Sequence, residues 1–195
     1  MSNVVPCAPG RYPRPAVVTF ATNIANAQDA SATAGTSPAS SALSPVDYQF
    51  VAEANLGSPF QVDSGRLGEK RAEDAVVRYY AHLTVVTHIL VVDALNTILK
   101  RKGIMPSPDT LLRGAYNTMI ATLKTEHGVV FDRDYVDGQV EYQKGNTALF
   151  QNEIQNGTNP DLKAFARQTL PKIEDHLRRA LKLAESAEGG RTASE

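Results

Sequence analysis

The segment from Phe131 to Leu183 constrains the fold most, because it reads as two long amphipathic helices whose inward faces are not fully apolar. Side chains spaced three and four residues apart share one face of a helix. The two series with this spacing are Tyr135, Gln139, Tyr142, Asn146, Leu149 and Glu153, and then Leu162, Ala166, Thr169, Ile173, His176 and Ala180. A core that contains such polar groups must satisfy them internally, since an unpaired buried donor or acceptor costs about 1–3 kcal/mol.

Three dipeptides predict where helices begin: Ser44-Pro45, Ser107-Pro108 and Asn159-Pro160. Each places a side-chain acceptor at an N-cap and proline at the first helical position, where its missing N–H does no harm. Gly103 and Gly157 stand where the preceding helices should stop. The chain is therefore predicted to be all-α, an up-down bundle of four long helices with a short additional helix connecting two antiparallel pairs. We place the helices at 45–72, 74–102, 108–126, 131–156 and 159–187, with a kink or break at Pro59.

The chain outside the bundle has a different composition. Arg11 and Arg14 precede a short apolar stretch, Ala16 to Ala21, and Ala25-Asn26-Ala27 has the small residues that a signal peptidase accepts. A plain disordered tail is the alternative. Residues 28–44 are mostly Ala, Ser, Thr and Gly, a composition typical of a linker. We expect a disordered tail or weak signal-like segment with a linker over 1–44, the bundle domain over 45–187, and a disordered C-terminal tail over 188–195.

The second predicted helix is the most apolar part of the chain. One heptad face holds Val77, Ala81, Thr84, His88, Val91, Leu95 and Ile98, and the flanks add Val85, Val86, Ile89, Leu90 and Val92. This pattern predicts a helix buried nearly all round. Its apolar run, Leu83 to Leu95, is shorter than the roughly 20 residues that span a bilayer, so no transmembrane span is expected. Any apolar surface that the domain leaves uncovered would form a homodimer face.

Charge and composition exclude several classes of function. Twenty basic and twenty-one acidic residues leave a net charge of −1, and no dense basic run predicts a nucleic-acid partner. The single cysteine, Cys7, excludes an internal disulfide framework and a multi-cysteine metal site. The sequence also lacks a glycine-rich phosphate loop, a nucleophile elbow and a cysteine–histidine pair. It therefore does not predict an enzyme.

A bundle with inward polar groups raises the question of a di-iron carboxylate site. That site needs two Glu-x-x-His pairs, because positions three apart deliver carboxylate and imidazole to the same metals. The residues three before His82, His88, His127 and His176 are Tyr79, Val85, Lys124 and Ile173. No di-iron site is expected, which leaves a single-metal site or a purely hydrogen-bonded layer.

Spaced motifs over roughly residues 46–185 carry a family resemblance. They are Asp47-x-x-Phe50, Gly65-x-Leu67, Tyr80-Ala81, His88, Phe131-Asp132-x-x-Tyr135 with Gln139-Val140, Asp161-Leu162-Lys163-x-Phe165-Ala166, and Leu170-Pro171 with His176. Together they resemble the bacterial domain-of-unknown-function 4142 family. The resemblance implies a ferritin-like helical bundle, frequently exported to the periplasm or cell envelope, with cytoplasmic location as the alternative. It implies no established activity.

The sequence departs from this family at positions with ligand character. The family usually has a glutamate-rich stretch where this chain has Gln61-Val62-Asp63-Ser64, a histidine where it has Tyr142, and an aspartate where Thr87 precedes His88. Of the family's polar, potentially ligating set, His88 and His176 are kept and one carboxylate is shortened to Asp63.

We therefore predict a polar core layer of Gln139, Tyr142, His88, His176 and Asp63. The favoured interpretation is a non-catalytic binding or structural protein of the periplasm or envelope, without a cofactor. One alternative is a metal-binding protein or weak metal-dependent oxidase, with one Fe, Mn, Zn or Cu ion held by His88, His176, Tyr142 and Asp63. Another is a carrier of a small apolar ligand of unknown identity inside the bundle.

Overall fold

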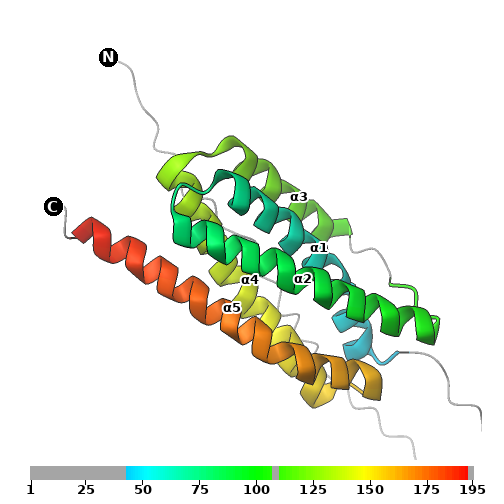
Figure 1. The fold of residues 1–195 in the computed structure, drawn as a ribbon. Helices are drawn as coiled ribbons and strands as arrows, with labels where there is room; N and C mark the ends of the chain where they lie inside the picture. Colours follow the sequence, from blue (N-terminus) through cyan, green and yellow to red (C-terminus); the bar gives the residue numbers. More distant parts are fainter. Residues whose placement is uncertain (1–42, 107–109, 193–195) are drawn as a thin grey trace, which may run out of the picture.

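The computed structural model describes residues 43–106 and 110–192, and these residues form five α-helices (Figure 1). The helices are α1 (Pro45–Arg71), α2 (Ala75–Lys102), α3 (Thr110–Thr125), α4 (Gly128–Asn156) and α5 (Pro160–Thr192). The predicted all-α helical bundle is confirmed.

The predicted start of α4 and the predicted end of α5 are wrong. Helix α4 begins at Gly128 rather than 131, and α5 continues to Thr192 rather than ending at 187. The first part of the expected C-terminal tail is thus helical, because adding residues to a docked helix costs little once the helix is nucleated. The expectations for residues 1–42 lie outside the described residues.

Consecutive helices run in alternating directions and form two packed hairpins (Figure 1). Helix α1 packs mainly on α2, and α4 mainly on α5. The hairpins join through contacts of α1 with α4 and of α2 with α5. Helix α3 returns the chain to the opposite end of the bundle and lies against α1. It connects the two antiparallel pairs, as the spacing predicts.

The residues predicted to begin and end helices act as caps. Ser44 and Asp47 form a reciprocal capping box at the start of α1. The Asn159 side chain accepts hydrogen bonds from the backbone N–H groups of Asp161 and Leu162 at 3.1 and 3.3 Å. Gly103 ends α2 in the left-handed conformation with φ 66°, a backbone region that favours glycine. The predicted cap at Ser107-Pro108 lies outside the described residues.

Helix α1 is continuous through Pro59, so the break expected there does not occur. Packing on both sides of the proline holds the helix: Phe60 stacks on Tyr116 of α3, with 4.3 Å between ring centroids, and Ser58 is buried. Pro59 itself faces solvent, where water can satisfy the carbonyl that a proline leaves without its helical donor.

The core consists of two apolar clusters that lie towards opposite ends of the bundle. The first contains Phe50, Val51, Ala54, Val91, Leu95, Leu99, Phe150, Leu162, Phe165, Ala166 and Ile173. The second contains Ala72, Val77, Tyr80, Ala81, Leu123, Phe131, Tyr135, Val136, Val140 and Ala180. Along α2, the buried Thr84 and His88 fall between residues of the second cluster and residues of the first. A polar layer therefore divides the apolar core.

The outer face of α2 corrects the prediction of a helix buried nearly all round. The heptad positions from Val77 to Leu95 are buried, but Val86 and Leu90 on the outer face are 45% and 59% exposed to solvent. Helices α1 and α5 pack against α2 and leave its outward face uncovered. By length and composition alone α2 also has the properties of a membrane-crossing helix, which core helices of water-soluble bundles share.

Candidate functional site

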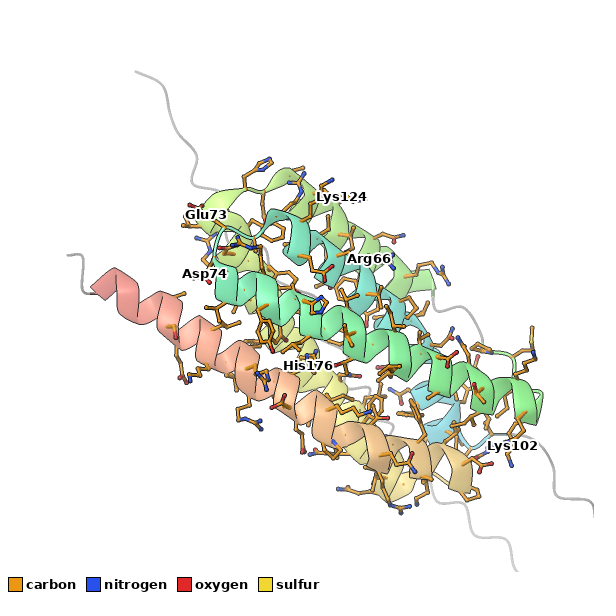
Figure 2. The ribbon with its side chains drawn as sticks, viewed as in Figure 1. Arg66, Glu73, Asp74, Lys102, Lys124 and His176 are labelled. Carbon is orange, nitrogen blue, oxygen red and sulfur yellow. The ribbon has the colours of Figure 1, made fainter. Side chains whose placement is uncertain are left out.

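Six buried polar side chains from all four long helices form the layer between the two clusters, which we call the middle layer. They are Gln61 of α1, Thr84 and His88 of α2, Gln139 and Gln143 of α4, and His176 of α5. Figure 2 shows His176 well away from Glu73, Asp74 and Lys102, which mark the two ends of α2. Gln139 of α4 and His176 of α5 belong to the two predicted inward-facing series, and both are buried. His176 lies within hydrogen-bonding range of α2.

His176 is held by two threonine hydroxyls of α2. Its Nδ1 lies 3.4 Å from Thr84 Oγ1, and its Nε2 lies 3.1 Å from Thr87 Oγ1. Thr84 donates its hydroxyl hydrogen to the carbonyl of Tyr80 at 3.0 Å. Because that hydrogen is engaged, Thr84 acts as the acceptor for a protonated Nδ1, and Nε2 accepts from Thr87. This arrangement joins α2 to α5 through a neutral imidazole.

A second chain of hydrogen bonds joins α2, α4 and α1. The hydroxyl of Tyr80 donates to Gln139 Oε1 at 3.4 Å, and Gln139 Nε2 donates to Ser64 Oγ at 3.3 Å. Ser64 in turn donates to the carbonyl of Gln61 at 3.2 Å. These bonds place Gln139 between two other helices, so the middle layer fixes how the helices face one another.

Three members of the middle layer lack partners within the described part of the chain. Both ring nitrogens of His88, and both amide atoms of Gln61 and Gln143, are buried without a hydrogen bond there. His88 is 1% exposed. Its ring centroid lies 5.8 Å from that of His176 and 6.4 Å from that of Tyr142. Unpaired buried groups of this kind mark places where a protein holds water or a ligand, or stores strain.

Burial keeps both histidines uncharged. It lowers the pKa of His88 to about 3, with a smaller contribution from repulsion by His176. Burial lowers the pKa of His176 to about 4, although Asp175 acts in the opposite direction. Burial also raises the pKa of Tyr142 well above its ordinary value. The layer is thus polar but carries no charge near neutral pH.

The structure brings together four of the five predicted layer residues and places the fifth elsewhere. His88, His176 and Gln139 are buried, and the half-buried Tyr142 packs its ring beside His88. Asp63 faces solvent. The break expected at Pro59 made it uncertain from sequence which way the residues after it face. In the continuous helix, Gln61 and Ser64 occupy the inward positions instead. The carboxylate expected in the layer is therefore absent from it.

Without Asp63, the proposed metal donors reduce to His88, His176 and Tyr142. Both nitrogens of His176 are engaged with threonines. In residues 43–106 and 110–192, no three His, Cys, Asp or Glu side chains gather where they could hold a metal ion. Within the described residues, His88 is the one of these three donors with ring nitrogens free of hydrogen bonds, so a metal held by this set would have to use it.

A shallow hollow described on the surface lies along α5 and does not include His88. It is lined by Glu174, Leu177, Arg178, Leu181, Lys182 and Glu185. An apolar carrier would be supported by a cavity beside His88, and a structural histidine by a bond from His88 to a protein side chain. Among the described residues, His88 makes no such hydrogen bond.

Sequence reasoning missed Gln61, Thr84, Thr87 and Gln143 as site residues. Gln143 follows Gln139 by four residues, a spacing that places both on one helix face. Thr84 belonged to the predicted heptad face. Its hydroxyl contacts His176, and that contact depends on which side of α5 faces α2. A wider search for polar residues on the inward faces would have found both.

These features define a class: an all-helical bundle domain whose core is crossed by an uncharged polar layer. The chain belongs to a family described as "Domain of unknown function (DUF4142)", whose model matches residues 32–183. The family expected from the spaced motifs is thereby confirmed.

The fold is similar to that of a solved structure, a DUF305 fragment from Deinococcus radiodurans. The TM-score is 0.66 at 17% sequence identity, and the match covers 74% of this chain and 98% of the fragment. At that identity the likeness concerns the fold alone. A comparison with curated proteins gave no match.

Proposed function

We propose that this chain is a non-catalytic binding or structural protein of the bacterial periplasm or cell envelope, and that it pairs with a second copy through α2. The supporting observation is a second seam on the outside of α2. Val76, Tyr79, Leu83, Val86 and Leu90 follow one another at steps of three and four, and four of them are exposed. A seam with this spacing is the pattern that packs helix against helix.

The charge pattern along α2 favours a second copy as the partner. The outer seam continues past Leu90 to Asp93, which is exposed. If two copies of α2 pair antiparallel about Val86, Asp93 of each copy faces Tyr79 and lies near Arg78 of the other. A phenolic hydroxyl and a guanidinium are suitable donors to a carboxylate. A twofold-symmetric pair is also the commonest way to cover a self-complementary apolar face.

Light scattering on the purified full chain tests the pairing. The expected molar mass is twice that of the 21.1 kDa chain. Leu90→Glu should give the monomer mass, because it places a charge in the seam, while Asn117→Glu on the exposed side of α3 should not. A monomeric wild-type chain at high concentration, or a chain recovered only with membranes, would contradict the pairing.

The location is supported by the family resemblance and by the signal-like segment near Ala16. Fusing residues 1–44 to a leaderless alkaline phosphatase tests it, since that enzyme requires disulfides that form outside the cytoplasm. Activity in intact cells is expected. Replacing Val17 and Val18 by aspartate should abolish export, because the apolar stretch is what the secretion machinery reads. An inactive wild-type fusion would favour the cytoplasm.

Metal binding is the second candidate function, and His88 is the observation that favours it. Within the described residues its two ring nitrogens are free, and its ring lies beside those of His176 and Tyr142. His176 would have to exchange a threonine hydrogen bond for the metal. Elemental analysis of untagged protein, exposed to iron, manganese, zinc or copper and then desalted, tests it. About one equivalent that is lost in His88→Ala would support a site. A value near zero would leave the layer without a metal.

A further inference from the structure

Two fully buried carboxyl groups lie where α1 begins against the turn between α4 and α5. Asp47 belongs to the first turn of α1, and Glu153 to the last turn of α4; both are 0% exposed. They belong neither to the middle layer nor to the α2 seam. Buried carboxyls are uncommon unless their oxygens are hydrogen-bonded, and these two differ in that respect.

Asp47 has donors on both oxygens. Its Oδ1 accepts the backbone N–H groups of Thr158 and Asn159, each at 3.0 Å. Its Oδ2 accepts from the Ser44 backbone and hydroxyl at 3.1 and 2.6 Å, and from the Thr158 hydroxyl at 2.7 Å. Although burial acts to raise it, these bonds hold the pKa of Asp47 well below its usual range. Asp47 therefore fastens α1 to the α4–α5 turn as an anion.

Glu153 has no such set of donors: within the described part of the chain its two buried oxygens accept no hydrogen bond, and the side chain that acts on it as a hydrogen-bonding partner is the carboxyl of Asp47. The charged groups that act on it are Asp47 of α1 and Lys163 of α5. The Lys163 ammonium is itself bonded to the carbonyl of Gly157 at 2.8 Å. Burial and the neighbouring Asp47 raise the pKa of Glu153 to about 7, and Lys163 offsets this only in part.

The turn is built closely around this carboxyl. A Cβ at Gly157 would overlap with the carboxyl group and with the backbone carbonyl of Glu153. Just beyond the pair, Phe50 packs on Phe150 and Phe165, with ring centroids 4.9 and 6.1 Å apart. Asp47 and Glu153 thus each lie one helical turn from a phenylalanine of the first apolar cluster.

We propose that Glu153 is held as the neutral acid beside the Asp47 anion, and that loss of its proton to solvent releases the start of α1 from the α4–α5 turn. A proton fits this place better than a cation, because the oxygens of Asp47 already accept five hydrogen bonds. Two adjacent buried carboxylates cannot both remain ionised without a large cost. The pair is therefore a pH-sensitive latch at one end of the bundle.

Hydrogen exchange of the Thr158 and Asn159 amides, which donate to Asp47, tests the latch in the full chain. After correction for intrinsic exchange, their protection should fall by up to about tenfold per pH unit between the ordinary glutamate pKa of about 4.3 and the folded value of about 7, since only in this range is opening coupled to loss of one proton. In Glu153→Gln the protection should stay constant. The exposed-site control Glu174→Gln should behave as wild type.

Protection that stays constant with pH in the wild-type chain, or that falls equally in Glu153→Gln, would overturn the proposal. A second measurement does not depend on the variant folding. The carboxyl carbon of Glu153 should titrate in the wild-type chain with a midpoint near 7, and a midpoint near that of an exposed glutamate would also overturn it.

Discussion

At the scale of single residues, the two core histidines link protonation to stability. The unfolded chain takes up protons on histidine near pH 6.5, whereas the folded pKa values of His88 and His176 are lowered to about 3 and 4. Below pH 6.5 the unfolded state thus binds more protons than the folded state. The free energy of unfolding contributed by these groups therefore falls as the pH is lowered from 6.5 towards 4.

His88→Leu should make that slope shallower by up to about 1.4 kcal/mol per pH unit, the value for one proton. Urea unfolding between pH 5 and 7 measures it. Glu153 has a raised pKa, so its contribution is present at low pH and is lost as the pH rises to about 7. The Glu153 contribution is the same in the wild type and in His88→Leu, so it cancels when the two slopes are compared. His127→Gln, at an exposed position, should retain the wild-type slope, and an unchanged slope in His88→Leu would contradict the buried neutral histidine.

Thr87→Asp tests the contact between Thr87 and His176. A carboxylate about where the hydroxyl now lies, 3.1 Å from Nε2, should stabilise the imidazolium and raise the pKa of His176 by about 1–3 units. Titration of the His176 ring signals by NMR gives the answer. Thr87→Asn supplies a side chain of similar size without charge and should leave the pKa low. If the pKa of His176 were the same in Thr87→Asp and Thr87→Asn, Thr87 would not face His176.

These residues show where sequence reasoning succeeds and where it stops. Helical spacing was sufficient to place Gln139 and His176 inside the bundle. It failed for Asp63 because a face of α1 could not be followed through Pro59. It also could not identify Thr87 as a partner of His176, since that contact joins positions 89 residues apart. Facing between helices is a tertiary property that spacing within one helix does not contain.

At the scale of helices, glycines in α1 allow the close approach of α2 and α4. A Cβ at Gly68 would lie 2.6 Å from Ala81 Cβ and 3.0 Å from Tyr135 Cζ, and one at Gly65 would lie 2.7 Å from Val85 Cγ2. The starts of α1 and α5 and the ends of α2 and α4 followed from proline, cap and glycine signals, but this approach distance did not. It requires knowing which faces of α1, α2 and α4 meet.

Gly68→Ala should therefore lower the free energy of unfolding by about 1–3 kcal/mol, because the added methyl group overpacks the α1–α2 contact. Gly114→Ala is a matched control: it lies in α3, and a Cβ there would meet no atom within 4 Å. It should raise stability by about 0.5–1 kcal/mol through helix propensity. Urea unfolding of both variants tests the pair, and a neutral or stabilising Gly68→Ala would contradict the packing.

At the scale of the whole molecule, the bundle buries a polar middle layer and exposes a row of apolar side chains on α2. In the described part of the chain, hydrogen bonds of the middle layer join the helices. The side chains of His88, Gln61 and Gln143 are buried there without a hydrogen-bond partner. Its outer α2 face carries Val76, Tyr79, Val86 and Leu90 into solvent. Composition alone predicted an apolar second helix, but which side of it stays uncovered depends on how α1 and α5 pack. The proposed role of the molecule therefore depends on that face.

Cross-linking through Val86 tests this account most directly. In a Cys7→Ser background, Val86→Cys places one thiol at the proposed twofold axis, where the two copies of α2 approach most closely. Mild oxidation should convert most of the chain to a disulfide-linked dimer, while Asn117→Cys on α3 should stay largely monomeric under the same conditions. Equal and slow cross-linking of the two variants would show that α2 does not pair with α2, and would contradict the proposed role of its outer face.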